Sequence, residues 1–210
     1  EIERENLKAM EDRKSEESKV QEKIDQNYSH SEQLTSFIDE VMGLNNIKFD
    51  QLAAVSIGSG PGSYTGLRIG VSVAKGLCFA LSIPLLSVCP LKAMAYNVAQ
   101  KEESNLYCSM IDARRMEVYS SIYTKQNEEE RQVKSEIITK SSYQKELKSS
   151  VLFFGTGAAK CKEFLNHHNA RFLDNIYPSS KNMGVIAFKK FCNKDFEDIA
   201  YFEPKYLKDF

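Results

Sequence analysis

Hydrophobic and polar residues change their spacing several times along this chain, and each change predicts a different element. Between residues 29 and 43, apolar residues recur every three or four positions, as on one face of an amphipathic helix. Ser29 and Glu32 form a capping-box pattern at its start, and Gly43 fits its end. Nearly all-apolar runs at 52–57 and 84–88 predict two buried strands.

Helical spacing follows each of these two strands. One helix is predicted from about Thr65 to Leu81, and the next from Pro90, a favoured first-turn residue, to about Ala99. The order strand, helix, strand, helix predicts an α/β domain with parallel strands.

The second half of the chain carries a different pattern. Strand-like runs at 106–111 and 118–123, joined by the charged sequence DARRME, predict a hairpin. We expect the polar residues 124–150 to form a variable connection with a short helix. Three further elements are predicted: a buried strand at 151–154 and helices at 158–165 and 182–191.

Charge sets the beginning of the chain apart. Fifteen of residues 1–26 are charged, nine acidic and six basic, and the few apolar residues keep no clean period. Such a segment buries too little apolar area to offset its ordering entropy, so we expect a poorly packed helix or disorder over 1–16 and a weak edge strand over 18–25. The chain then divides into an atypical segment, 1–17, a first lobe, 18–103, and a second lobe, 104–210.

Composition narrows the class of protein. The net charge of −1 gives the whole chain no field that would attract a polyanion. The five cysteines are widely spaced without a CxxC pair, which favours a reducing compartment and indicates neither a disulfide framework nor a zinc site. The most apolar stretch, 76–86, is too short to span a bilayer. We expect a soluble, cytoplasmic protein without membrane contact.

The glycine-rich sequence IGSGPGSYTGLRIGVSVAKGL, residues 57–77, raises the question of nucleotide binding. It matches neither the Walker A pattern nor GxGxxG, so two specific phosphate motifs are excluded. The free amides of a helix N-terminus still attract anions. Four loop residues therefore remain candidates for nucleotide or partner contact: Ser59, Gly60, Gly62 and Ser63.

Small residues continue from this loop into the helix with a spacing of four. Positions i and i+4 share one helix face, which here holds Gly66, Gly70, Ala74 and Cys78. Glycine inside a helix costs about 1 kcal/mol relative to alanine, so we expect a compensating close approach of another helix on this face. The neighbouring row, Ile69, Val73, Leu77 and Leu81, is expected to pack on the sheet.

Four ordered blocks resemble the TsaB (YeaZ) family, a glycoprotease-like group of pseudo-enzymes. They are SGPGSYTGLRIGVSVAKGL, IDARRMEVY, FFGTGA and EPKYLKDF, and the resemblance covers about residues 18–210. It implies an α/β fold of the two-lobed, actin-like (hexokinase/Hsp70) ATPase type. It also implies a non-catalytic subunit that activates a TsaD-like enzyme for threonylcarbamoylation of adenosine 37 in tRNA. A TsaE-like ATPase would join the complex, the subunit would contact tRNA indirectly through this complex, and the isolated subunit would form a homodimer.

The resemblance also places an interface on two helices of the first lobe. The positions that match are His30, Glu32, Leu34 and Ile38 on one helix and Thr65, Gly66, Arg68, Gly70 and Ala74 on the other. Residues 1–17 lack the apolar strand and Asp-Thr turn with which the family opens, so the first lobe is expected to lack its opening strands.

Few residues have the spacing that catalysis needs. The catalytic paralogue carries an HxxxH pair, but here Leu34 stands four residues after His30, so no metal site is expected. His167 and His168 are neighbours that would point apart on a helix. No GxSxG elbow surrounds Ser63, and Cys89 and Cys108 are interpreted as structural thiols.

Two further loops carry open alternatives. Asp112 and Arg114 lie in a charged hairpin turn that is either a solvated bend or a contact for a partner or tRNA. Gly155 and Gly157 are either a turn or a nucleotide contact, and no strongly bound cofactor is expected. The alternative functions are an active actin-like ATPase or kinase, a metallopeptidase of the glycoprotease kind, and a nucleic-acid module, which the net charge disfavours.

Overall fold

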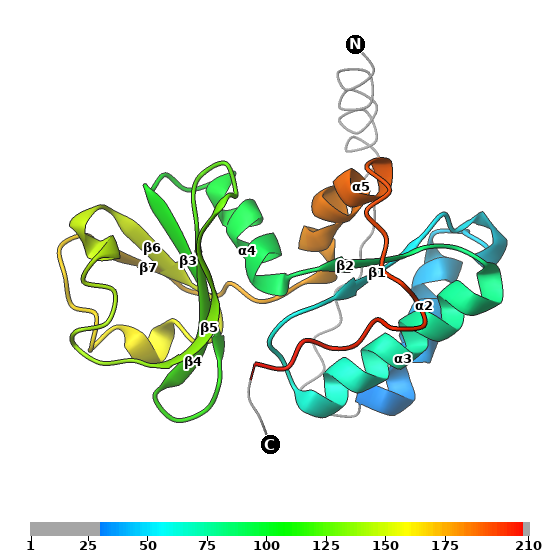
Figure 1. Ribbon diagram of the computed structural model, residues 1–210, viewed down its shortest axis with the longest axis horizontal. Helices are drawn as coiled ribbons and strands as arrows, with labels where there is room; N and C mark the ends of the chain where they lie inside the picture. The colour runs from blue at the N-terminus through cyan, green and yellow to red at the C-terminus, as the bar shows by residue number, and fades with distance from the viewer. Residues whose placement is uncertain (1–29, 208–210) are drawn as a thin grey trace, which may run out of the picture. The chain divides into compact units, whose positions relative to one another are not determined.

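The computed structural model describes residues 30–207, which belong to two units, 1–52 and 53–210 (Figure 1). The predictions for 1–17, for a strand over 18–25 and for a cap at Ser29 lie outside the described residues.

The first unit contains the predicted amphipathic helix. Helix α2 (His30–Leu44) is followed by the short 3-10 helix η1 (Phe49–Gln51). The chain leaves α2 through Asn46, whose φ is 53°, and the Ile47 N–H donates to the Met42 carbonyl at 3.0 Å. The end near Gly43 is therefore confirmed. Leu34 and Ile38 are half-buried, whereas Val41 is 42% exposed.

A two-stranded parallel sheet begins the second unit. Strand β1 (Val55–Gly58) pairs with β2 (Leu85–Val88), which confirms the parallel arrangement. Helix α3 (Tyr64–Leu81) and helix α5 (Gly184–Cys192) lie on opposite sides of this pair (Figure 1). Side chains of β2 alternate between them: Leu85 packs with Cys78 of α3, and Leu86 packs with Ala187 of α5.

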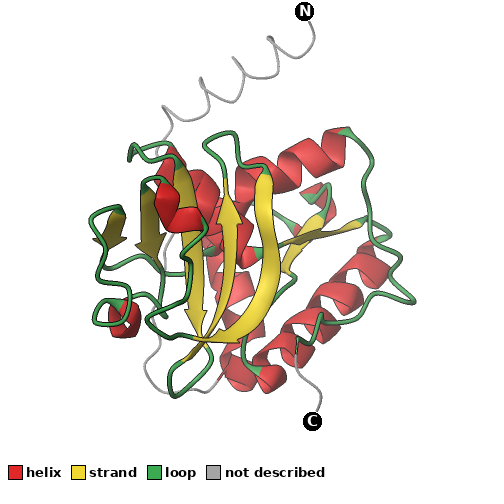
Figure 2. Cartoon of the chain, turned by 60° about the vertical axis from the view of Figure 1, so that its left-hand side comes forward, coloured by secondary structure: helices red, strands yellow, loops and turns green. Residues whose placement is uncertain are grey.

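A five-stranded mixed sheet forms the second core, with the order β5-β4-β3-β6-β7 (Figure 2). Its strands are β3 (Leu106–Asp112), β4 (Glu117–Tyr123), β5 (Glu129–Ile137), β6 (Val151–Phe154) and β7 (Ala170–Leu173). The antiparallel β3–β4 pair confirms the predicted hairpin, and β6 runs parallel to β3.

Each face of this sheet is covered. Helix α4 (Pro90–Ala99), with the predicted bounds, packs Leu91 and Met94 against Tyr107 and Phe154. The other face packs under the segments that connect β5 to β6 and β6 to β7, with Phe153, Cys108 and Ile122 among its fully buried side chains.

Several sequence predictions for this half were wrong in detail. The polar stretch 124–150 contains β5, and β7 was also missed; charged side chains that pair with one another hide the alternation of β5. The predicted helix over 158–165 is only the 3-10 helix η3 (Ala159–Cys161) with turns, because most of its hydrogen bonds join residues three apart. His167 and His168 consequently do not point apart, and their ring centroids lie 4.2 Å from each other.

Strand β1 also differs from its prediction. It begins at Val55 rather than at Leu52, Ser56 is exposed and the other strand residues are half-buried, so the prediction of a buried strand was wrong. The helix predicted over 182–191 is found as η4 (Ser180–Met183) and α5.

The end of the chain returns to the first sheet. The Glu197 N–H donates to the Leu85 carbonyl at 2.8 Å, and Phe202 packs against the Ala74 and Cys78 cluster. The Lys75 ammonium donates to the carbonyls of Ala200 and Phe202 at 3.2 and 3.0 Å. The lobe boundary near residue 103, between α4 and β3, stays a prediction. None of the helices in the described part of the chain is long and apolar enough to cross a membrane.

Candidate functional site

The glycine loop, residues 58–63, packs against the start of α4. A side chain on Gly60 would meet Pro90 Cδ at 3.1 Å and Cys89 Sγ at 3.5 Å, so glycine is required for the close approach. The Ser59 N–H donates to the Val88 carbonyl at 2.9 Å. Packing and backbone pairing therefore explain this part of the loop, and nucleotide contact there stays a prediction.

Ser63 begins α3 as its N-cap. Its Oγ accepts from the Gly66 N–H at 3.4 Å, which satisfies one of the free amides at the helix start. The missing side chain of Gly62 faces Leu67, at an ordinary contact distance of 3.5 Å. Because the Gly66 N–H already donates to Ser63, this amide is not free to bind an anion.

The row of small residues on α3 faces its own sheet. A Cβ on Gly70 would lie 3.1 Å from Ile57 Cδ1 of β1, and Ala74 and Cys78 are buried beside Leu85 of β2. The prediction that Gly70 and Ala74 open toward another helix was therefore wrong. Spacing identifies residues that share a face, but it does not say which neighbour that face meets.

The open face of α3 lies elsewhere on the helix. Thr65, Ser72 and Gly76 are exposed, and a side chain on Gly76 would meet nothing within 4 Å. Phe79, one turn further along, is 82% exposed. We call these four residues the open face of α3.

Arg68, a predicted interface residue, is already engaged. Its guanidinium lies 4.5 Å from the centroid of the Tyr64 ring, and its Nε donates to the Tyr206 hydroxyl at 3.2 Å. The Tyr206 ring also packs against the Tyr64 ring at a tilt of 38°, with centroids 5.1 Å apart. The C-terminal segment thus holds this arginine in place.

The turn between β3 and β4 has an unusual backbone. Arg114 and Arg115 have φ values of 71° and 47°, a left-handed conformation that costs roughly 1–2 kcal/mol for each non-glycine residue. Asp112 Oδ1 accepts from the Arg114 N–H at 2.6 Å and from the Lys160 ammonium at 2.7 Å. Lys160 also donates to the carbonyls of Arg115 and Glu117, both at 2.7 Å. These bonds hold the turn in its strained form.

The loop after β6 lies against the base of this hairpin. Gly155 has a φ of 104°, and a side chain there would lie 2.1 Å from the Met110 carbonyl oxygen. A side chain on Gly157 would lie 2.9 Å from Val118 Cγ1. Thr156 Oγ1 accepts from the Asp112 N–H at 3.1 Å. Close packing on β3 and β4 explains both glycines, and a nucleotide contact there stays a prediction.

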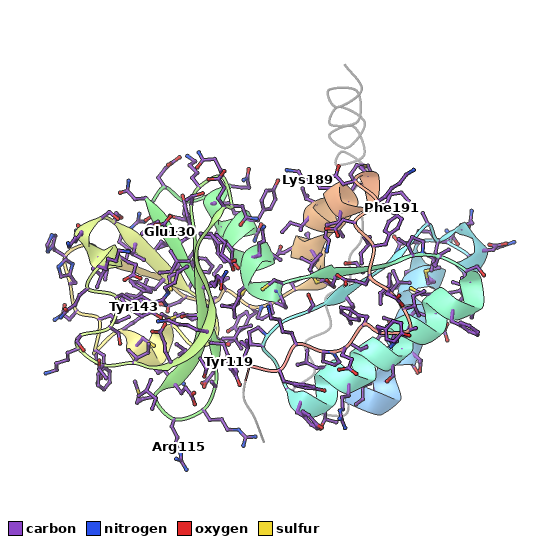
Figure 3. The ribbon with its side chains drawn as sticks, in the orientation of Figure 1. Arg115, Tyr119, Glu130, Tyr143, Lys189 and Phe191 are labelled. Atoms are coloured by element: carbon purple, nitrogen blue, oxygen red, sulfur yellow. The ribbon has the colours of Figure 1, made fainter. Side chains whose placement is uncertain are left out.

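A polar cluster under the sheet was missed by the sequence analysis. The Tyr143 hydroxyl, on the side away from α4, donates to Glu136 at 2.6 Å and lies 2.9 Å from Ser120 Oγ (Figure 3). The Arg131 guanidinium donates to Ser120 and pairs with Glu136 while stacking over the Tyr143 ring at 4.3 Å. The residues lie on three separate segments, so no spacing in the sequence identifies the cluster.

Two opposing effects set the protonation of this cluster. Burial by itself raises the pKa of Glu136, but the bonds from Ser120 and Tyr143 and the charges of Arg131 and Lys134 hold the pKa below its ordinary value. The carboxylate is therefore kept ionised, and the cluster fastens β4, β5 and the following loop together.

Burial keeps the two thiols of the second core, Cys108 and Cys161, protonated. Burial raises the pKa of Cys108 far above its ordinary range and raises that of Cys161 to about 11. Cys161 Sγ donates to the Gly157 carbonyl at 3.1 Å. Within residues 30–207, no three His, Cys, Asp or Glu side chains gather as a metal site would require.

Comparison with known proteins identifies the family. A family model described as TsaD, tRNA N6-adenosine threonylcarbamoyltransferase, matches residues 25–210. The chain belongs to the TsaD family.

Within the TsaD family, similar curated proteins carry the name tRNA threonylcarbamoyladenosine biosynthesis protein TsaB. The Haemophilus influenzae protein is 27% identical over 191 residues, 86% of this chain and 80% of its own length. The Escherichia coli protein is 26% identical over 189 residues, with 86% and 81% covered. The predicted resemblance to TsaB is confirmed.

A solved structure supports the fold. An uncharacterized Pseudomonas aeruginosa protein, described as similar to the peptidase YEAZ, superposes with a TM-score of 0.75 at 22% identity, covering 86% of this chain and 85% of that one. The predicted α/β fold of the actin-like type is confirmed.

Proposed function

We propose that this chain is a non-catalytic subunit that binds and activates a TsaD-like enzyme for threonylcarbamoylation of adenosine 37 in tRNA. The observation that carries the proposal is the match to two proteins named TsaB over 86% of the chain. Participation in the biosynthesis of threonylcarbamoyladenosine is the broader part of the proposal, and activation of the partner is the finer part.

The local chemistry supports a role without catalysis. The glycine loop is packed on Pro90, and its Ser63 hydroxyl caps a helix. Cys108 and Cys161 are buried thiols with raised pKa values. Leu34 stands where a second metal-binding histidine would be needed beside His30.

The pairing surface in this proposal is the open face of α3, and a contact through His30, Glu32, Leu34 and Ile38 of α2 stays a separate prediction. Glycine and serine at positions 76 and 72 allow a partner helix to approach closely. Phe79 supplies an aromatic side chain, and its burial would contribute roughly 1.5–3 kcal/mol to association. The same surface would pair two copies when the enzyme is absent, and a TsaE-like ATPase would join the heterodimer.

Reconstitution tests the proposal directly. The chain is mixed with a TsaD-like enzyme, a TsaE-like ATPase, ATP, threonylcarbamoyl-adenylate and tRNA, and modified adenosine is measured. We expect modification to depend on the chain. An equal rate without it would refute activation, and turnover of ATP or of a peptide by the chain alone would favour the enzymatic alternatives.

A matched pair of variants tests the surface. Phe79→Ser should weaken the heterodimer by about ten- to a hundredfold in sedimentation velocity, because it removes a large apolar contact. Phe188→Ser removes another exposed phenylalanine, on α5, and should leave association unchanged. Equal effects of both substitutions would contradict the assignment of α3.

A further inference from the structure

The turn between β3 and β4 presents two arginines whose charges are not neutralised. Arg114 and Arg115 are both exposed, and neither guanidinium has an ion-pair or hydrogen-bond partner among residues 30–207. Arg115 extends from the tip of the hairpin away from the sheet (Figure 3). The other three arginines among residues 30–207 are engaged: Arg68 by Tyr206, Arg131 by Glu136 and Arg171 by Glu102.

The acidic groups of the turn are committed elsewhere. Asp112 binds the Lys160 ammonium at 2.7 Å, and Glu117 accepts from the Ser135 hydroxyl. Lys160 is in turn surrounded by Asp112 and two carbonyls, with 21% of its side chain exposed. The cationic charge that the turn offers to solvent is therefore that of the two arginines.

The backbone under these arginines is fixed before any ligand arrives. The Arg114 N–H is held by Asp112 and the Arg115 carbonyl by Lys160, while the Glu117 N–H donates to the Arg114 carbonyl at 3.1 Å. Preorganisation lowers the ordering cost of binding, because only the two side chains remain to be immobilised. Asparagine or glycine would adopt this left-handed backbone conformation with less strain, so the conformation of the turn does not explain why arginine occurs at these two positions.

We propose that Arg114 and Arg115 bind phosphates of the tRNA backbone. This proposal rests on the proposed role in tRNA modification. The planar guanidinium donates two parallel N–H bonds to a phosphate, and phosphate contacts need no apolar surface around them.

An acidic protein surface is the less favoured ligand. Protein interfaces are usually built around an apolar or aromatic centre. At this end of the sheet, the large exposed apolar side chain is Ile137, which is paired with Glu117 across β4 and β5. One such side chain beside two arginines suits a polyanion better than a protein partner.

The test measures tRNA affinity with the turn kept intact. The complex of this chain with its TsaD-like enzyme is titrated against a fluorescently labelled, unmodified tRNA transcript at several salt concentrations. The variant is Arg114→Asn with Arg115→Asn, because asparagine tolerates the left-handed conformation and removes both charges. The control is Lys181→Gln with Lys189→Gln, two exposed cations in η4 and α5, which changes the net charge equally.

The arginine variant should bind tRNA about tenfold more weakly near 0.1 M salt, and the slope of log affinity against log salt should become shallower by about 1 to 2. The lysine control should stay within about twofold of the parent, because its charges lie away from the proposed contact. Unchanged affinity and slope in the arginine variant, or an equal loss in the control, would overturn the proposal.

Two additional measurements separate this proposal from the proposed function. Sedimentation without tRNA reports pairing with the enzyme, and the same titration is repeated with the chain alone. If the parent chain fails to pair with the enzyme, the proposed function fails, while the titration of the chain alone still decides the arginine contact. If the arginine variant loses pairing but keeps its tRNA affinity, the turn binds an acidic protein surface and the phosphate assignment is wrong.

Discussion

Replacing Gly70 by leucine should destabilise the fold, because this position of α3 faces β1. A Cβ there would already lie 3.1 Å from Ile57 Cδ1, and the rest of the leucine side chain would enter the space that Ile57 occupies. Overpacking of this kind costs about 1–3 kcal/mol, whereas removing a helical glycine returns about 0.8 kcal/mol. The two effects together give an expected loss of about 0.2–2.2 kcal/mol in the free energy of unfolding.

Gly76→Leu is the matched control on the same helix. A side chain at Gly76 meets nothing within 4 Å, so only the gain in helix propensity applies, and the free energy of unfolding should rise by about 0.8 kcal/mol. The two variants then differ by about 1–3 kcal/mol, or roughly 0.5–1.5 M in urea midpoint at a slope of about 2 kcal/mol/M. The same control should weaken pairing with the enzyme, because it changes the open face of α3.

Urea unfolding followed by circular dichroism measures this difference. If Gly70→Leu proves as stable as Gly76→Leu, the row of Gly70, Ala74 and Cys78 does not pack on β1 and β2, and the original expectation of a face open to another helix regains its support.

Two further substitutions test the second sheet. Gly155→Ala places a side chain at a φ of 104°, 2.1 Å from the Met110 carbonyl oxygen, and should lower the free energy of unfolding in urea by about 3 kcal/mol or more. The control Gly184→Ala has open space around the new side chain and should cost nothing. A loss of less than about 1 kcal/mol in Gly155→Ala would contradict the close packing of Gly155 on Met110. Because the pKa of Glu136 is lower in the folded chain, its stabilising effect is complete above the ordinary value of about 4.3 and is lost as the pH falls through the folded pKa. The free energy of unfolding should therefore fall with acid more steeply in the parent than in Glu136→Gln, and parallel pH profiles would refute this role.

Local patterns were sufficient to predict most of the elements. Pro90 and the apolar periodicity after it predicted α4 with its observed bounds, and the runs around DARRME predicted the β3–β4 hairpin. Strand β5 was missed because Arg131 and Glu136 neutralise each other in the folded chain, while in the sequence they read as solvated polar residues. The partner that makes such a residue tolerable in a strand lies on another segment.

The candidate site residues show the same contrast between local sequence patterns and contacts with distant segments. The sequence singled out the glycines at 60 and 155 as contacts for a nucleotide or partner, and this stays a prediction. The structure explains both by close packing on Pro90 and on Met110, which are distant in the sequence. Likewise, DARRME predicted a charged turn, whereas the engagement of Asp112 by Lys160 depends on a loop that follows β6.

The sequence by itself determined the family, the α/β order of elements and the excluded phosphate motifs, because these depend on neighbouring residues and on periodicity. Only the tertiary structure decided which face of α3 meets β1 and β2 and which face stays open. It also decided which charges are neutralised and which, on Arg114 and Arg115, remain available. Helical spacing defines faces but not their neighbours, and the energy of a charge depends on groups that folding brings to it from other parts of the chain.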